Sequence, residues 1–82
     1  MLSLIGGRQS MEYTVHITWD EEAEVWIATS DDVRGLVMES SSYEMLIARL
    51  KDAVPELLEL NGQPKMSCLK CISVMQQVYA CG

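Results

Sequence analysis

The sequence predicts an α+β fold: a three-stranded antiparallel sheet, one helix packed on one face, and a fourth strand near the C-terminus. Apolar residues alternate with polar ones over residues 13–19, a period of two that indicates a half-buried strand. From Ser42 the period changes to about 3.6, which indicates an amphipathic helix. The chain has 82 residues, which is room for one small domain and not two.

Three strands are predicted before the helix. The acidic residues 20–22 interrupt the first strand as a turn would, so residues 13–19 and 25–29 are expected to form an antiparallel hairpin. Residues 30–32 mark the next loop, in which Gly35 can adopt a positive φ. A short third strand follows over residues 36–38.

The helix is predicted to begin at a capping box. The Ser41 hydroxyl can accept a hydrogen bond from the backbone N–H of Glu44, and the Glu44 carboxylate can accept one from the backbone N–H of Ser41. Pro55 is expected to kink or break the helix, and Asn61 with Gly62 fits a left-handed C-cap. The predicted apolar stripe consists of Leu46, Leu50, Ala53 and Leu57, flanked by Ile47, Val54, Leu58 and Leu60.

The tail after Pro64 is open to two interpretations. Ile72, Val74 and Val78 alternate with more polar residues, which favours a strand over residues 69–79. A helix with apolar residues on one side also fits. The strand gives the order β-β-β-α-β, a single sheet with a helix on one face.

Composition limits the classes of partner. The formal net charge is −6, which repels phosphate backbones and attracts a basic protein, so no direct nucleic-acid contact is expected. No apolar run approaches the roughly 20 residues of a membrane helix, so no membrane contact is expected either. Because a domain this small is marginally stable and an open sheet leaves free edges, we expect a homodimer or larger oligomer.

The N-terminus and the cysteines indicate a cytoplasmic protein. Residues 1–10 lack the features of a secretory signal, and we interpret them as a leader or unstructured N-terminus before a single domain over residues 11–82. Three cysteines, an odd number, make a poor disulfide framework, so reduced thiols are expected.

Cys68 and Cys71 form a CxxC pair, a spacing that zinc sites and redox pairs both use. Zinc needs about four ligands, and only Cys81 and His16 remain to complete the set. We favour incidental thiols and predict no metal and no cofactor. His16 is interpreted as an exposed strand residue, because no neighbouring acid or nucleophile supports a general base.

Acids and tryptophans supply the candidate partner-binding residues. Paired carboxylates can bind metal or act as acid and base, but no nucleophile or phosphate loop accompanies them, so no enzymatic activity is predicted. Trp26 is out of phase with its apolar neighbours, which leaves open whether it lies in the core or anchors an interface on the outer sheet face. The predicted partner-binding residues are Trp19, Asp20, Trp26, Asp31 and Asp32.

Residues 13–60 resemble the HicB-like small domains, in particular the short stand-alone branch of unknown function. The resemblance is carried by the strands over residues 13–17 and 25–28, the turn over residues 32–36, and the capped helix after Ser41. Arg34 stands where this family usually has proline, and Ser40 and Ser41 stand where Gly-Asp is common.

The resemblance implies a partial ribonuclease-H-like fold and a non-enzymatic, antitoxin-like role, in which the domain neutralises a small basic toxin that cleaves RNA. The DNA-binding segment of complete antitoxins does not carry over. Residues 63–82 are too few for a helix-turn-helix, and with two Lys and no Arg they do not resemble a ribbon-helix-helix. Two alternatives stay open: a self-associating structural or regulatory oligomer without a toxin, and a small metal- or thiol-binding protein that uses the C-terminal cysteines.

Overall fold

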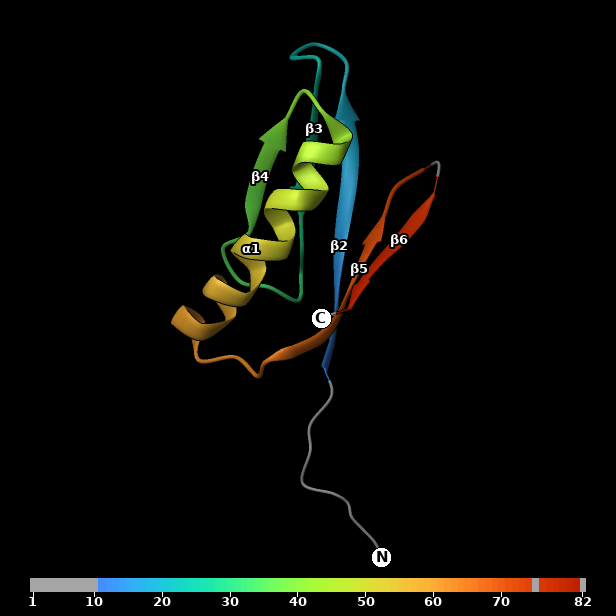
Figure 1. Ribbon diagram of the computed structural model, residues 1–82. Coiled ribbons are helices and arrows are strands. Elements are labelled where there is room, and N and C mark those ends of the chain that lie inside the picture. Colours follow the sequence, from blue (N-terminus) through green and yellow to red (C-terminus); the bar gives the residue numbers. More distant parts are fainter. Residues whose placement is uncertain (1–10, 75, 82) are drawn as a thin grey trace, which may run out of the picture.

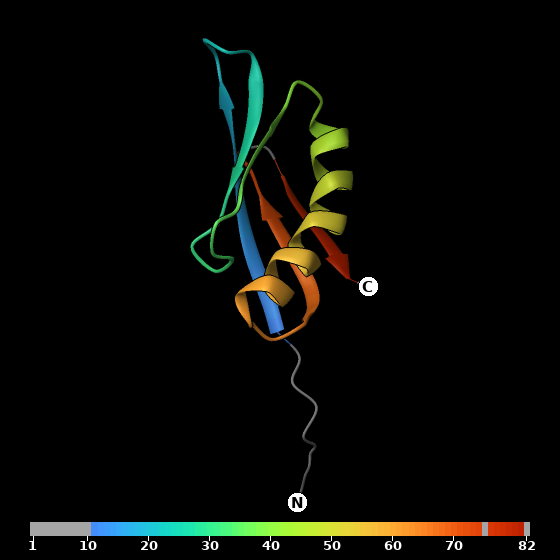
Figure 2. The same ribbon diagram turned by 90° about the vertical axis from the view of Figure 1, so that its left-hand side faces the viewer.

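A five-stranded mixed sheet with one helix along one face forms the described part of the chain, residues 11–74 and 76–81, in this computed structural model (Figure 1). The strands lie in the order β4-β3-β2-β5-β6. Figure 2 shows the helix on one side of the sheet, and no described element covers the other side. The leader predicted for residues 1–10 lies outside the described residues. The elements in chain order are β2 (Met11–Asp20), β3 (Val25–Thr29), β4 (Val37–Ser40), α1 (Tyr43–Asn61), β5 (Met66–Ile72) and β6 (Gln77–Cys81).

The predicted architecture of three antiparallel strands and a fourth is wrong in the number and direction of its strands, although the class stays α+β. β3 pairs with β2 and β4 in antiparallel fashion, but β5 joins the other edge of β2 in parallel. Parallel strands need a long crossover, and α1 belongs to the crossover that leads into β5. Periodicity identifies strands but not which neighbour each one pairs with, so it could not predict this topology.

The tail is a β-hairpin and not the single strand predicted over residues 69–79. β6 runs antiparallel to β5. At the turn the backbone N–H of Ser73 donates to the carbonyl of Gln76, and the Ser73 hydroxyl accepts from the Gln76 N–H. The turn contains no Gly, Pro, Asn or Asp, the residues that usually reveal one, so its sequence reads as continuous strand.

The core lies between α1 and the inner face of the sheet. Val15 and Ile17 of β2 and Leu69 of β5 are fully buried there. The buried stripe of the helix differs from the predicted one: its fully buried members are four residues apart, and Leu60 is 82% exposed. These buried helix residues are Leu46, Leu50, Val54 and Leu58.

The helix termini correct one predicted cap and confirm the other. Ser42, not Ser41, is the N-cap, and its hydroxyl accepts from the Met45 N–H at 3.2 Å. The helix runs unbroken through Pro55. Gly62 adopts φ 70° as the C-cap, as predicted.

Among residues 11–74 and 76–81, no helix has both the length and the apolar character needed to cross a membrane.

Candidate functional site

Two tryptophans and a tyrosine form an aromatic cluster at one end of the sheet. Trp19 and Trp26 are direct partners in the β2–β3 ladder, with ring centroids 5.0 Å apart. Trp26 also meets the edge of Tyr43, the first residue of α1, at 5.2 Å. Trp26 therefore lies on the helix side of the sheet, which excludes the predicted alternative of an anchor on the outer face.

A hollow of about 390 Å³ opens beside this cluster, lined by Trp19, Trp26, Ser41 and Val74. Three segments far apart in sequence build it: the ends of β2 and β3, the residue after β4, and the β5–β6 turn. Trp19 is 44% exposed and Val74 is 95% exposed. The hollow thus presents aromatic surface to solvent. Val74 was missed as a site residue because only the parallel placement of β5 brings this turn to the tryptophans. Ser41 was missed because its hydroxyl was assigned to the helix cap.

Carboxylates surround the aromatic end. Asp20 closes the β2–β3 turn, since its Oδ1 accepts from the backbone N–H groups of Glu22 at 3.0 Å and Ala23 at 3.3 Å. The acidic side chains of the turn that follows are exposed, as is Glu44 in the first turn of α1. Asp20 therefore shapes the turn, whereas Glu21, Glu22 and Glu24 are free to face a partner.

Asp31 and Asp32 lie away from this end, in the loop that follows β3. Asp32 Oδ2 accepts from the backbone N–H of Thr14 at 2.9 Å. The Ser30 hydroxyl in the same loop donates to the Thr14 carbonyl at 2.5 Å. The loop thereby supplies hydrogen bonds to β2 where the β3 ladder has ended. The structure separates the five predicted partner-binding residues into two groups, with only Trp19, Asp20 and Trp26 together.

This difference between two adjacent acids predicts unequal effects on stability. Asp32→Ala removes the acceptor of the Thr14 N–H and should lower the free energy of unfolding by about 0.5–1.5 kcal/mol. Asp31→Ala is the matched control and should change it by less than about 0.5 kcal/mol, because Asp31 is as exposed as Asp32 but is not the acceptor of the Thr14 N–H. Urea denaturation of both variants measures this; equal midpoints would show that the Asp32 bond does not hold the loop.

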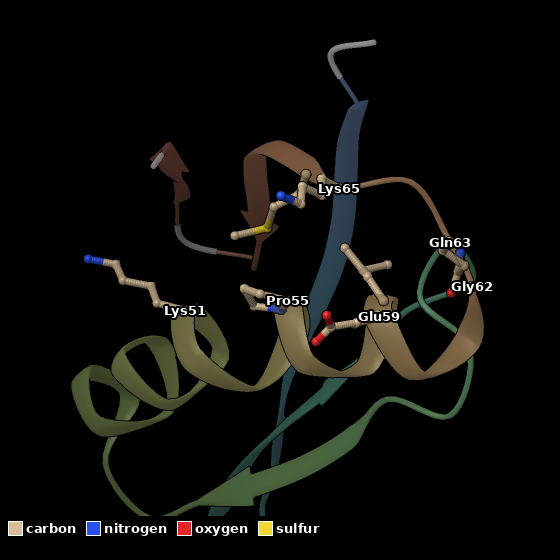
Figure 3. Close-up of a pocket in the computed structure, with 8 residues that line it drawn as sticks. Lys51, Pro55, Glu59, Gly62, Gln63 and Lys65 are labelled. Carbon is tan, nitrogen blue, oxygen red and sulfur yellow. The ribbon is translucent and has the colours of Figure 1, made fainter. Parts of the chain in front are cut away.

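A second pocket, of about 660 Å³, lies between the C-terminal half of α1 and the segment leading to β5 (Figure 3). Lys51, Pro55 and Glu59 line it from the helix, and Lys65 lines it from the segment. Because ammonium and carboxylate groups share its walls, its charge favours no single class of ligand.

The cysteines do not form the predicted CxxC site. Residues three apart on a strand point to opposite faces. Cys68 lies opposite Cys81 on β6 and is joined to it by a disulfide, so the prediction of reduced thiols is wrong for these two. Cys71 is buried on the inner face. Burial raises the pKa of its thiol, and the Lys51 ammonium opposes that shift.

His16 is exposed on the outer sheet face, as its place in the first strand predicts. Within the described ranges, no group of three or more His, Cys, Asp or Glu side chains is arranged to hold a metal ion.

Comparisons with known proteins identify relatives without a described function. Residues 12–73 match a family described as a domain of unknown function, DUF1902. The crystal structure of a hypothetical protein from the extremely thermophilic bacterium Thermus thermophilus superposes with a TM-score of 0.71 at 41% sequence identity. That match covers 83% of this chain and 99% of the Thermus chain. None of the curated proteins matches.

Proposed function

The chain belongs to the DUF1902 family, and we propose that it is a non-enzymatic module that binds a basic protein through the end formed by the β2–β3 turn and the start of α1. More specifically, we propose that the partner is a small basic toxin that cleaves RNA, as the resemblance to the HicB-like domains implies. A cytoplasmic location belongs to the proposal, because messenger RNA is translated in the cytoplasm. In that compartment the Cys68–Cys81 bridge would be reduced, so the proposed binding must not depend on it.

Segregation of charge is the observation that carries this proposal. Asp20, Glu21, Glu22 and Glu24 lie at the β2–β3 turn that follows Trp19, and Glu44 lies in the first turn of α1 at the same end of the sheet (Figure 1). Described basic residues lie elsewhere: Lys51 and Lys65 line the second pocket, and Lys70 lies near the Tyr79 ring on the β5–β6 hairpin. On the helix, Arg49 is more than one turn beyond Glu44. Exposed acids also lie elsewhere, for example Asp52, Glu56 and Glu59 on α1, but there the helix also carries Arg49 and Lys51. A local concentration of negative charge steers an oppositely charged partner and raises its association rate.

The order of elements is also compatible with the proposal. From β2 to β5 the chain follows the β-β-β-α-β order that the HicB-like resemblance implies, and β6 is an addition.

Self-association without a toxin is the second candidate. No described element covers the outer sheet face, where Val37 is 72% and Tyr79 is 54% exposed. Within the part of the sheet that the structure describes, β4 and β6 are the edge strands, and edge strands can pair with another chain through their outer backbone groups. A dimer formed through either surface would leave the acidic end free.

Capture of partners from native cell extract tests the proposed function with two charge-matched variants. The first, Glu21→Gln/Glu22→Gln/Glu24→Gln, neutralises the turn and leaves Asp20 to close it. The second, Asp52→Asn/Glu56→Gln/Glu59→Gln, removes the same charge from exposed positions on α1. We expect wild type and the helix variant to retain a basic protein at low salt. The turn variant should associate with it about tenfold more slowly.

The identity and behaviour of the captured protein decide between the candidates. A captured protein that cleaves RNA, and is inhibited by the added chain, supports the antitoxin-like role. Equal capture by both variants would contradict binding through the acidic end. Recovery of the chain alone, with sedimentation showing a multimer, would leave the self-associating module.

A further inference from the structure

We propose that the hollow at the acidic end is a receptor for one arginine side chain of the basic partner, with the guanidinium against the exposed ring of Trp19. This rests on the proposed function and names the group that the site would recognise. Three observations carry it: the size of the hollow, the aromatic surface that it exposes, and the charge around it.

The hollow is large enough to admit one long side chain. Its volume of about 390 Å³ lies at the low end of the roughly 300–1,000 Å³ of ligand pockets. Its lining supplies two indole rings, one hydroxyl and one aliphatic side chain. Arginine brings a long apolar stem and a planar polar head, which match such a mixed lining.

Trp19 supplies the exposed aromatic surface. Among aromatic rings, indole attracts a cation most strongly, and arginine is the commoner cation in such contacts. Trp26 packs between Trp19 and Tyr43, so the Trp19 ring is supported by a second aromatic ring. Trp19 itself stays 44% exposed, which leaves ring surface available to a ligand.

The charge around the hollow selects a cation over a neutral or anionic group. Asp20 follows Trp19 directly, and its strand partner Val25 follows Glu24. Consecutive strand residues point to opposite faces of the sheet, so Asp20 does not line the hollow. It and the exposed acids of the β2–β3 turn contribute a negative field at this end, which acts over the Debye length of roughly 8 Å at physiological salt. A second copy of this acidic chain would meet repulsion here.

Arginine is favoured over lysine because of its hydration and shape. The guanidinium is planar, more weakly hydrated than an ammonium, and stacks on aromatic faces. An arginine can stack its guanidinium on the open aromatic surface, whereas a bound lysine would be stabilised chiefly by the diffuse negative field. The hollow should therefore discriminate between two side chains of the same charge.

Capped tripeptides that differ only in their central residue test this inference on the full-length chain. The peptides are Gly-Arg-Gly, Gly-Lys-Gly and the neutral isostere Gly-citrulline-Gly, titrated while the two indole N–H resonances are followed by NMR. We expect the arginine peptide to bind severalfold more tightly than the lysine peptide, and the citrulline peptide to bind weakest. The resonance of Trp19 should move most.

Substitutions at two exposed positions locate the binding. Trp19→Leu removes the exposed indole ring and should lower the affinity for the arginine peptide about two- to fivefold, with a smaller effect on the lysine peptide. Val74 is 95% exposed, so both Val74→Lys and Val74→Glu should fold. Val74→Lys should weaken arginine binding and Val74→Glu should strengthen it.

Equal affinities for the arginine and citrulline peptides, or shifts that spare Trp19, would overturn the inference. So would a hollow occupied by a second copy, seen as self-association that Val74→Lys abolishes. If the peptides show no arginine preference but the turn variant still loses the basic protein, only this inference fails. If the arginine peptide binds as expected and no basic protein is captured, the proposed function fails and the receptor stands.

Discussion

Leu50→Ala should lower the free energy of unfolding by about 2–5 kcal/mol, the usual cost of truncating a fully buried leucine. Leu50 is 0% exposed and lies at the centre of the buried stripe of α1, with Leu46 and Val54 one turn to either side. Small domains are stabilised by only about 5–15 kcal/mol, so this one change would remove a large share.

Leu60→Ala is the matched control for that measurement, because Leu60 lies on the same helix and is 82% exposed. Its free energy of unfolding should differ from wild type by less than about 0.5 kcal/mol. Urea denaturation of both variants provides the comparison. A loss below about 0.5 kcal/mol for Leu50→Ala would mean that this face of α1 does not pack on the sheet.

The sequence was sufficient for the elements whose signals are local. The alternation in β2, the run at 25–29 and the change of period at the helix each depend on neighbours along the chain. So does the left-handed cap at Gly62. The N-cap moved by one residue because the serines at 40–42 offer the same hydroxyl. Which of them caps α1 depends on where the chain leaves β4.

The pairing between distant strands could not be predicted from the sequence. The parallel alignment of β2 with β5 joins residues more than fifty positions apart, and no local pattern encodes that choice. The β5–β6 hairpin was missed for a related reason: Ser73 builds its turn with a hydroxyl, where glycine or asparagine would have signalled one.

The candidate site was predicted in part for the same reasons. Trp19, Asp20 and Trp26 belong to one hairpin, so predicting that hairpin from the sequence also predicts that these residues lie close together. Asp32 is different, because its carboxylate bonds to Thr14 and thus belongs to the framework of the loop. Val74 reaches the hollow only through the topology of the sheet.

The disulfide between Cys68 and Cys81 should stabilise the domain appreciably, although the sequence suggested reduced thiols. The two cysteines are 13 residues apart, and closing a loop of about this length contributes roughly 3 kcal/mol in the chain-entropy model. Among the described strands, β6 lies at an edge and pairs with β5 alone, so the bridge fixes a strand that has only one described neighbour in the sheet. We expect reduction to lower the free energy of unfolding by about 2–4 kcal/mol.

Reduction should also loosen β6 first. Edge elements with few buried contacts open most readily, so amide hydrogen exchange after reduction should accelerate more in β6 than in β2, which lies at the centre of the sheet. The double variant Cys68→Ser/Cys81→Ser should match the reduced protein in both measurements and should not respond to dithiothreitol.

Thiol titration identifies the bridge independently of stability. In denaturant without reductant, the air-oxidised protein should show one reactive thiol, that of Cys71, which is the free and buried cysteine. Three should react after reduction. In the native state Cys71 should react slowly with alkylating reagents, because burial raises its pKa and the thiolate is the reactive form. Three reactive thiols before reduction, with an unfolding midpoint that reductant leaves unchanged, would show that β6 is held by its ladder to β5 alone.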